Sequence, residues 1–501
     1  MCGIVGYSGP KEPLPILIGG LSRLEYRGYD SAGIAVSDGS DITIEKKEGK
    51  LDVLKEHLAD KKIKGNIGIG HTRWATHGVP NDVNAHPHSD NSEDFAIIHN
   101  GIIENYAEMK DSLLKENYSF KSDTDTEVVA IELSKQWNGN LLETVVKVTK
   151  DLEGTYALVV TTTKQENTIV AGRMMSPLVL GVGEGEVFLA SDSAAILEHT
   201  NKMIFLENGD FVEIHDGNYK LFDADLNDIE REVQIIDWEV SEAEKSGHDH
   251  FMYKEILEQA EVIERTITGR LEEGSPEIPI TKEKAQKYEK IWIVACGTAY
   301  HAGLFGKDLF EKVLGVPVSV ELASEFRYRE PIIGENDLGI VISQSGETMD
   351  TIAATELLKE NGSHVLALVN VVGSSLARMA DSVFYLHVGP EIGVASTKAY
   401  LGMLVGQLVL AKHWDTQNKL DVSFEEIKGL PSLIEETLKC EKEIKEIAES
   451  IYKQNDVYFI GRGLDYALAA EGALKLKEIS YLHAEALAAG ELKHGTLALI
   501  Q

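Results

Sequence analysis

The sequence predicts two fold classes in succession: an α+β first half, then α/β units built on parallel sheets. Before residue 240, short runs of alternating apolar and polar residues, typical of strands, are separated by segments with helical periodicity. After residue 250, apolar strands alternate with long helices, which is the pattern of a parallel sheet. Within this second half, the strand that ends at Gly297 recurs at Gly463, and the segment at Glu321 recurs at Glu485. We therefore expect two copies of one α/β unit.

The first half opens with an apolar strand directly after Cys2, and we expect stacked sheets covered by helices over residues 2–240. Alternation predicts further strands at 32–38, 41–49, 66–74, 94–103, 155–163, 186–192 and 211–222. Periodicity predicts helices at 105–116, 126–137 and 141–153. A polar, acidic stretch at 241–250 then interrupts the strands, and we expect it to be a linker.

The second half is expected to hold one α/β subdomain at 251–420 and another at 421–501. The sequence predicts a helix at 252–269 and then strands at 291–297, 317–322, 338–343, 364–369 and 382–388. A helical stretch at 424–453 precedes a last apolar strand at 456–463. The strand at 338–343 has no counterpart in the second copy, so we expect that copy to be incomplete and the sequence to be a fragment of a longer chain.

Composition excludes several classes of function. The 501 residues include 82 acidic and 48 basic side chains, and a net charge of -34 disfavours nucleic acid and anionic membranes as partners. The three cysteines, Cys2, Cys296 and Cys440, form no spacing typical of a disulfide framework or a zinc site. There is no leader pattern and no apolar run long enough to span a bilayer. We expect a cytoplasmic protein with no membrane association.

Cys2 is the most informative single residue. If Met1 is removed, one residue carries both a thiol and a free α-amine whose pKa is about 7.7 to 8.0. The amine can then accept the proton of its own side chain, so the sulfur needs no histidine to become a nucleophile. The alternative is a terminal strand in which a small cysteine simply packs inward.

Three further motifs in the first half could bind an amino-acid substrate. Arg73, at the end of a strand, could hold a carboxylate through two hydrogen bonds, or it could be a surface arginine. Asn100 and Gly101 could form an oxyanion hole, or only a turn. Asp125 could bind an ammonium group, or only cap a helix. Together the motifs fit glutamine, an α-amino acid with a side-chain carboxamide that Cys2 could attack.

The second half carries two candidate groups. Ser343, Gln344, Ser345 and Thr348 lie between a strand and a helix, where hydroxyls and backbone N–H groups can bind a phosphate, and Thr298 occupies the corresponding turn after another strand. Lys475, Glu478 and His494 would suit an aldose–ketose isomerisation, in which a carboxylate moves a proton and a histidine opens the sugar ring. The alternative is a surface ion pair with a loop histidine.

These residues lie in motifs that run in order along the whole chain. The motifs are MCGIVGY (1–7), LEYRGYDSAG (24–33), HTRWATHG (71–78), HNGIIEN (99–105), SDTDTE (122–127), ACGT (295–298), SEFRYR (324–329), SQSGET (343–348), GPEIGVASTKAY (389–400), EGALKLKEISYLHAEA (471–486) and GELKHG (490–495). In this set the sequence resembles the glutamine:fructose-6-phosphate aminotransferase (isomerising) family. The resemblance implies an N-terminal-nucleophile glutaminase domain with αββα layers, followed by sugar-isomerase (SIS) subdomains.

The resemblance also implies roles for individual residues. Cys2 attacks the glutamine amide, and Asn100 and Gly101 hold the oxyanion. Glutamine is bound by Arg73, Trp74, Thr76, His77 and Asp125, with Trp74 also helping to gate an internal ammonia channel. Fructose 6-phosphate is bound by Thr298, Ser343, Gln344, Ser345 and Thr348. Catalysis at the sugar involves Glu478, Lys475 and His494, the last from a neighbouring subunit, which implies a homodimer.

The main functional hypothesis is therefore conversion of L-glutamine and fructose 6-phosphate to glucosamine 6-phosphate and glutamate, with no metal or organic cofactor. The family's sugar-binding lysine lies in a C-terminal tail that this sequence lacks, so the chain as written is expected to retain only glutaminase activity. The alternative is a sugar-phosphate-binding regulator built on a degraded synthase. That alternative is disfavoured by the presence of the residues that the activity requires, which are Cys2, Arg73, Asn100, Asp125, Glu478 and His494.

Overall fold

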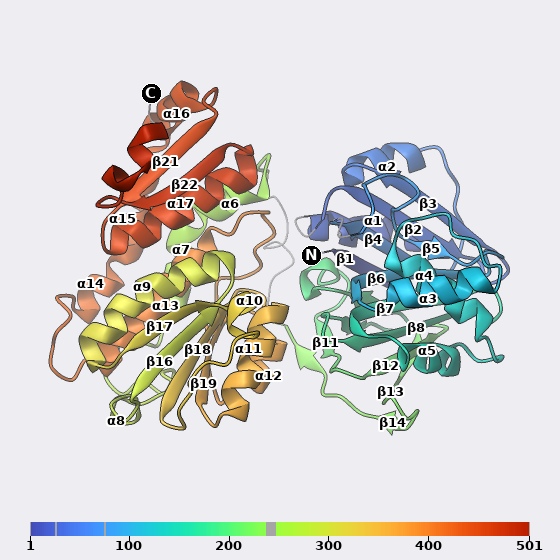
Figure 1. Cartoon of the computed structure of the whole chain (residues 1–501), viewed down its shortest axis with the longest axis horizontal. Helices are drawn as coiled ribbons and strands as arrows, with labels where there is room; N and C mark the ends of the chain where they lie inside the picture. Colours follow the sequence, from blue (N-terminus) through green and yellow to red (C-terminus); the bar gives the residue numbers. More distant parts are fainter. Residues whose placement is uncertain (1, 26–27, 75–76, 237–246, 500–501) are drawn as a thin grey trace. The chain divides into compact units, whose positions relative to one another are not determined.

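The computed structural model describes residues 2–25, 28–74, 77–236 and 247–499. The chain divides into two compact units, Met1–Ala243 and Glu244–Gln501, and each is described by itself (Figure 1). Among the described residues, no helix is long and apolar enough to cross a membrane.

The first unit is built on two β-sheets that pack face to face. One has eight strands in the order β15-β11-β9-β10-β1-β4-β2-β3, and the other has seven in the order β14-β13-β12-β8-β7-β6-β5. The strands of the first sheet are β1 (Gly3–Ser8), β2 (Ser31–Ser37), β3 (Ile42–Glu48), β4 (Ile67–Arg73), β9 (Val179–Val182), β10 (Val187–Ala190), β11 (Lys202–Phe205) and β15 (Gln234–Ile235). Those of the second are β5 (His88–Ser89), β6 (Phe95–Ile103), β7 (Gly154–Thr162), β8 (Thr168–Met174), β12 (Phe211–His215), β13 (Asn218–Phe222) and β14 (Asp228–Ile229).

Helices cover the outer faces of both sheets, which confirms the predicted αββα layers (Figure 1). The helices are α1 (Pro13–Leu24), α2 (Leu51–Leu58), α3 (Tyr106–Lys115), α4 (Asp125–Lys135) and α5 (Leu141–Thr149). Side-chain alternation explains the layers, because successive residues of a strand point to opposite faces. On β6, Ala96 and Ile98 join the core between the sheets, whereas Phe95 and Ile97 pack toward α4 and α5. The sequence analysis missed α1, α2, β8, β9 and β11 as separate elements.

The second unit contains a five-stranded parallel sheet in the order β17-β16-β18-β19-β20. Its strands are β16 (Lys290–Ala295), β17 (Val318–Leu322), β18 (Asp337–Ser343), β19 (His364–Val369) and β20 (Ser382–Tyr385). Apolar side chains fill both of its faces, as a doubly covered parallel sheet requires. The covering helices are α6 (Phe251–Leu257), α7 (Gln259–Ile267), α8 (Lys282–Ala285), α9 (Gly297–Leu314), α10 (Ala323–Phe326), α11 (Met349–Glu360), α12 (Ser375–Met379) and α13 (Lys398–Trp414).

The remaining segment repeats the start of this arrangement. β21 (Asp456–Gly461) and β22 (His483–Ala488) form a parallel pair joined by α17 (Leu464–Ser480), as β16 and β17 are joined by α9. Gly297 and Gly463 share a positive φ, of 54° and 59°, at the start of the two helices, so the internal repeat is confirmed. The expected helical stretch at 424–453 is three helices, α14 (Phe424–Lys428), α15 (Leu430–Leu438) and α16 (Glu441–Ile451), and the expected helix at 252–269 is divided into α6 and α7.

Candidate active sites

Strand alternation gathers the candidate residues of the first unit into the layer between its two sheets. Ile4 of β1 lies opposite His71 of β4, and both Ile4 and Ile69 belong to the core between the sheets. Because side chains two residues apart share a face, His71 and Arg73 point into the same layer. Asn100 shares a face of β6 with Ile98 and reaches that layer from the opposite sheet.

Cys2 lies at the beginning of β1, half-buried beside the end of β4. Its Sγ accepts a hydrogen bond from the backbone N–H of Trp74 at 3.3 Å and donates to the carbonyl oxygen of the same residue at 3.6 Å. Burial raises the pKa of the Cys2 thiol, and the hydrogen bond from Trp74 acts in the opposite direction. The indole of Trp74 is 48% exposed and contacts the ring of Tyr29 edge-on.

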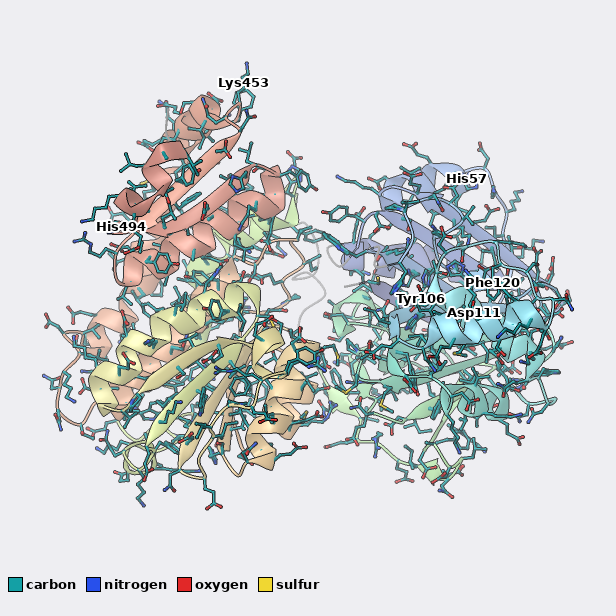
Figure 2. All side chains as sticks on the ribbon, in the orientation of Figure 1. His57, Tyr106, Asp111, Phe120, Lys453 and His494 are labelled. Carbon is teal, nitrogen blue, oxygen red and sulfur yellow. The ribbon has the colours of Figure 1, made fainter. Side chains whose placement is uncertain are left out.

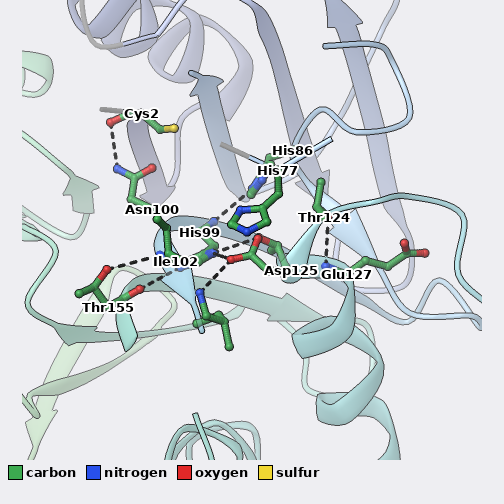
Figure 3. A network of polar contacts seen from close by, with 12 residues as sticks. Cys2, His77, His86, His99, Asn100, Ile102, Thr124, Asp125, Glu127 and Thr155 are labelled. Atoms are coloured by element: carbon green, nitrogen blue, oxygen red, sulfur yellow. Dashed lines mark hydrogen bonds and ion pairs between the residues drawn. The ribbon is translucent and has the colours of Figure 1, made fainter. Parts of the chain in front are cut away.

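The carboxamide of Asn100 adjoins Cys2, as Figure 3 shows. Its Nδ2 donates to the Cys2 carbonyl oxygen at 2.9 Å, and its Oδ1 lies 3.0 Å from His71 Nε2. Gly101 follows with a φ of 134°, and a Cβ there would lie only 2.0 Å from the Thr155 carbonyl oxygen. Any residue other than glycine at position 101 would therefore require the backbone to shift.

Arg73 and Asp125 are both buried. Arg73 Nη2 donates to the His77 carbonyl oxygen, whereas Nη1 is buried and has no hydrogen-bond partner within the described part of the chain. Asp125 begins α4, and its Oδ2 accepts from the backbone N–H of Ile103 at 2.9 Å and lies 3.8 Å from His99 Nδ1 (Figure 3). An unpartnered guanidinium nitrogen next to a strand end is suited to binding a carboxylate.

Sequence reasoning missed a cluster of buried histidines around this site. The imidazoles of His71 and His86 stack with their centroids 4.2 Å apart, and His88 contacts His86 edge-on. Burial lowers the pKa of His71 to about 3, and it also lowers the pKa of His86, His88 and His99. The four rings are therefore neutral at pH 7. The sequence signal for this cluster was the recurrence of histidine within HTRWATHG, NAHPHS and HNG. The spacing of these segments does not indicate that their histidines meet in the fold.

In the second unit, strand order brings two candidate turns together. In the sheet, β17 lies on one side of β16 and β18 on the other, so the strand order reverses direction at β16. Parallel sheets bind ligands at such a switch, in the crevice outside the carboxyl ends of the two strands, here β16 and β18. Thr298 follows β16, and the turn 343–348 follows β18. Ser343 Oγ accepts from the Gly346 N–H at 3.0 Å and lies 3.0 Å from Thr348 Oγ1. The turn thus places hydroxyls at the N-terminus of α11, where a phosphate is favoured.

The carboxylate of Glu347, within the same turn, is hydrogen-bonded to a residue outside the turn. Glu347 is buried, and its two carboxylate oxygens accept from the N–H and Oγ of Ser375 at 2.7 and 2.8 Å. Gln344 and Ser345 are half-buried, and Ser345 Oγ accepts from the Glu347 N–H at 3.1 Å. Hydrogen bonds therefore hold the side chains of Ser345 and Glu347 in place.

A buried carboxylate that sequence reasoning also missed joins α9 to α17. Glu471 is 4% exposed, and its Oε1 accepts from Thr298 Oγ1 at 2.9 Å while its Oε2 lies 2.7 Å from His301 Nδ1. Lys475 Nζ donates to Thr298 Oγ1 at 3.0 Å and lies 2.5 Å from Glu478 Oε2. The structure therefore brings Thr298, Lys475 and Glu478 together. Residues 471, 475 and 478 share one helix face, a spacing that could have indicated Glu471.

Two predicted residues fall elsewhere. His494 lies exposed in the short helix η4 (Leu492–His494), and among the described residues it is not part of the network around Glu471 (Figure 2). Thr76 lies outside the described residues.

The two folds and their sites define a glutamine amidotransferase joined to a sugar-isomerase domain. A family model described as a glutamine amidotransferase domain matches residues 56–233, and one described as an SIS domain matches residues 285–411 and 450–501. Two curated relatives, both named glutamine–fructose-6-phosphate aminotransferase (isomerizing), cover the whole of this chain. That of Clostridium acetobutylicum is 49% identical, and that of Clostridium tetani is 50% identical.

The chain belongs to the glutamine–fructose-6-phosphate aminotransferase (isomerizing) family. It spans 84% of the length of each of these two relatives, which is consistent with the expectation that the C-terminal end of the family is missing from this sequence. A solved structure, the C-terminal domain of glucosamine-fructose-6-phosphate aminotransferase from Francisella tularensis, is 44% identical. The match covers 52% of this chain and 75% of that one, with a TM-score of 0.48.

Proposed function

We propose that this protein transfers the amide nitrogen of L-glutamine to D-fructose 6-phosphate, forming L-glutamate and D-glucosamine 6-phosphate, the first step of hexosamine biosynthesis. The observation that carries the proposal is the position of Cys2 at the end of β4, whose last residue is Arg73. The Cys2 Sγ accepts from the Trp74 N–H, and the Cys2 carbonyl oxygen accepts from the Asn100 carboxamide. Thiol, amide donor and guanidinium are the groups that acyl transfer from an amino-acid side chain requires.

The first half-reaction is assigned to the residues between the two sheets. The α-amine of Cys2, free once Met1 is removed, accepts the thiol proton, and the sulfur attacks the carboxamide carbon of glutamine. Asn100 and Gly101 donate to the oxyanion, the C–N bond breaks, and ammonia leaves. Water then cleaves the thioester to give glutamate. Arg73 and Asp125 bind the carboxylate and ammonium of the substrate, together with Trp74, Thr76 and His77.

The second half-reaction is assigned to the crevice of the parallel sheet. Ser343, Gln344, Ser345 and Thr348, with Thr298, hold the phosphorylated ketose. Ammonia adds to C2 of the open sugar and water leaves, which gives an imine at C2. One proton then moves from C1 to C2 while the C1 hydroxyl proton passes to nitrogen, so that C1 becomes the aldehyde of the 2-amino-aldose. We assign the shuttling of that proton to Glu478, which is paired with Lys475, and no redox reagent is needed. His494 of a neighbouring subunit assists ring opening in a homodimer.

We also propose the boundaries 2–240 for the glutaminase domain, 241–250 for the linker, and 251–420 and 421–501 for the isomerase subdomains. A cytoplasmic location fits substrates of this kind. Ammonia would pass to the sugar through a channel that Trp74 helps to gate, which keeps it unprotonated.

Replacement of Cys2 tests the first half-reaction. The Cys2→Ala protein should release no glutamate from L-glutamine, whereas Cys440→Ala, which removes an exposed cysteine, should hydrolyse glutamine at the parental rate. Glutamate is measured in a coupled dehydrogenase assay, and the melting temperature confirms that each variant is folded. Hydrolysis by Cys2→Ala at the parental rate would falsify the assigned nucleophile.

A further inference from the structure

His71 is held in one orientation and one tautomer by groups whose hydrogen-bonding roles cannot change. Its Nε2 lies 3.1 Å from the His99 carbonyl oxygen and 3.0 Å from Asn100 Oδ1. A backbone carbonyl can only accept, so Nε2 must carry the proton and donate. Nδ1 is then the bare nitrogen, and it is buried with no hydrogen-bond partner among the residues that the structure describes. The ring is 1% exposed and is stacked on His86, which prevents rotation.

This donor fixes the carboxamide of Asn100. Because His71 Nε2 donates, the atom of Asn100 that faces it must be the oxygen. At the other end, Nδ2 faces the Cys2 carbonyl oxygen at 2.9 Å, which also can only accept. A carboxamide nitrogen carries two hydrogens, so one binds Cys2 and the other is available to an oxyanion formed at the sulfur.

We propose that His71 is a positioning residue, which orients the Asn100 carboxamide so that its N–H groups face the reacting sulfur of Cys2. The proposal rests on the proposed glutaminase function and adds a residue to it. Without His71 the carboxamide can turn and present its oxygen to the sulfur, where the developing negative charge would be repelled. Loss of one oxyanion donor lowers kcat by about 100-fold or more.

Burial explains why this role suits a histidine. Removal from water lowers the pKa of His71 to about 3, so the ring stays a neutral single donor over the whole working range of pH. A charged side chain between the two sheets would be costly unless paired.

The test compares two substitutions that differ by one methylene. In His71→Gln the side-chain amide reaches the position of Nε2 and can still donate, whereas in His71→Asn it reaches only the position of Nδ1. We expect His71→Asn to lose about 100-fold in kcat for glutamine hydrolysis with KM within about threefold, and His71→Gln to recover most of that loss. The matched control is His88→Gln, since His88 is buried in the same cluster but bonds Thr124. Its kcat should stay near the parental value.

Two readouts separate positioning from a general structural role. Glutamate γ-semialdehyde forms a tetrahedral adduct with a thiol, so its affinity should fall in His71→Asn as far as kcat does, while affinity for L-glutamate is unchanged. In an Asn100→Ala background, His71→Asn should cost nothing further, because the two residues act as one unit. If His71→Asn does not fold, His71→Met, which likewise puts no donor at the position of Nε2, replaces it.

Three results would overturn the proposal: kcat of His71→Asn within threefold of the parent, equal impairment of the Asn and Gln variants, or a parallel loss of glutamate binding. A failure of the glutaminase function is distinguishable, because the parental protein would then release no glutamate from L-glutamine, and a wrong nucleophile would leave Cys2→Ala active. If Cys2→Ala is inactive and His71→Asn is unimpaired, only the role of His71 is wrong.

Discussion

Gly101 shows how a single residue determines whether the candidate oxyanion hole can form. A side chain there meets both a φ of 134° and the Thr155 carbonyl oxygen at 2.0 Å. We predict that Gly101→Ala destabilises the first unit by about 2 to 3 kcal/mol and abolishes glutamine hydrolysis, because β6 and β7 must separate to admit the methyl group. Thermal unfolding and the glutamate assay measure the two effects.

Gly139 supplies the control at this scale. Its φ is 102°, but a Cβ there would contact nothing within 4 Å. Gly139→Ala therefore carries the conformational strain without the collision and should retain hydrolysis. Equal damage from both substitutions would show that the approach to Thr155 is not the cause.

At the scale of elements, the buried histidines lie on β4, β5 and β6 and in the loop that leads into β5. Burial lowers the pKa of His71 to about 3 and also lowers that of His86, His88 and His99, against about 6.5 in the unfolded chain. The charges of Lys46 and Arg73 add to this effect, while Asp125 opposes it at His99. Between the two pKa values the unfolded state binds more protons, so stability is complete above about pH 6.5 and is lost as the pH falls.

We predict that the melting temperature of the first unit drops steeply between pH 7 and pH 5. A histidine whose folded pKa lies well below this interval, as that of His71 does at about 3, contributes about 1.4 kcal/mol per pH unit once the pH is below its unfolded pKa. His88→Gln, which removes one imidazole, should make this dependence shallower. A melting temperature that stays constant over the interval would contradict the assigned burial.

The sequence predicted some helices and strands well and missed others. The strands around β4, β6, β16 and β18 were predicted near their observed bounds, because their apolar alternation or apolar runs reflect the face that each strand buries. Helix α1 was missed, because its start, Pro13, lies in a segment with two prolines and two glycines that reads locally as a loop. Its packing against β1 and β4 overrides that propensity.

At the scale of the molecule, the two compact units predict two separable ligand responses. We expect saturating L-glutamate to raise the melting temperature of the first unit and fructose 6-phosphate to raise that of the second, each by roughly 5 °C at about 100 times Kd. Thr348→Val should reduce only the response to fructose 6-phosphate, since it removes a hydroxyl from the candidate phosphate turn. Differential scanning calorimetry follows both transitions.

The control is Thr355→Val, because Thr355 is buried on α11, the helix that Thr348 precedes, and its hydroxyl donates to the Thr351 carbonyl oxygen at 2.8 Å. It should leave the response to fructose 6-phosphate intact. If Thr348→Val and Thr355→Val reduce that response equally, the turn 343–348 is not the binding site.

The sequence by itself determined the order of the folds, the repeat within the second half and the motifs that carry chemistry, since each is written in residues close together along the chain. Only the tertiary structure placed His71 against Asn100 and Glu471 between Thr298 and His301. Those contacts join residues that are 29 to 173 positions apart. Such bonds depend on how sheets and helices pack, and local patterns of polarity carry no record of which buried side chains will meet.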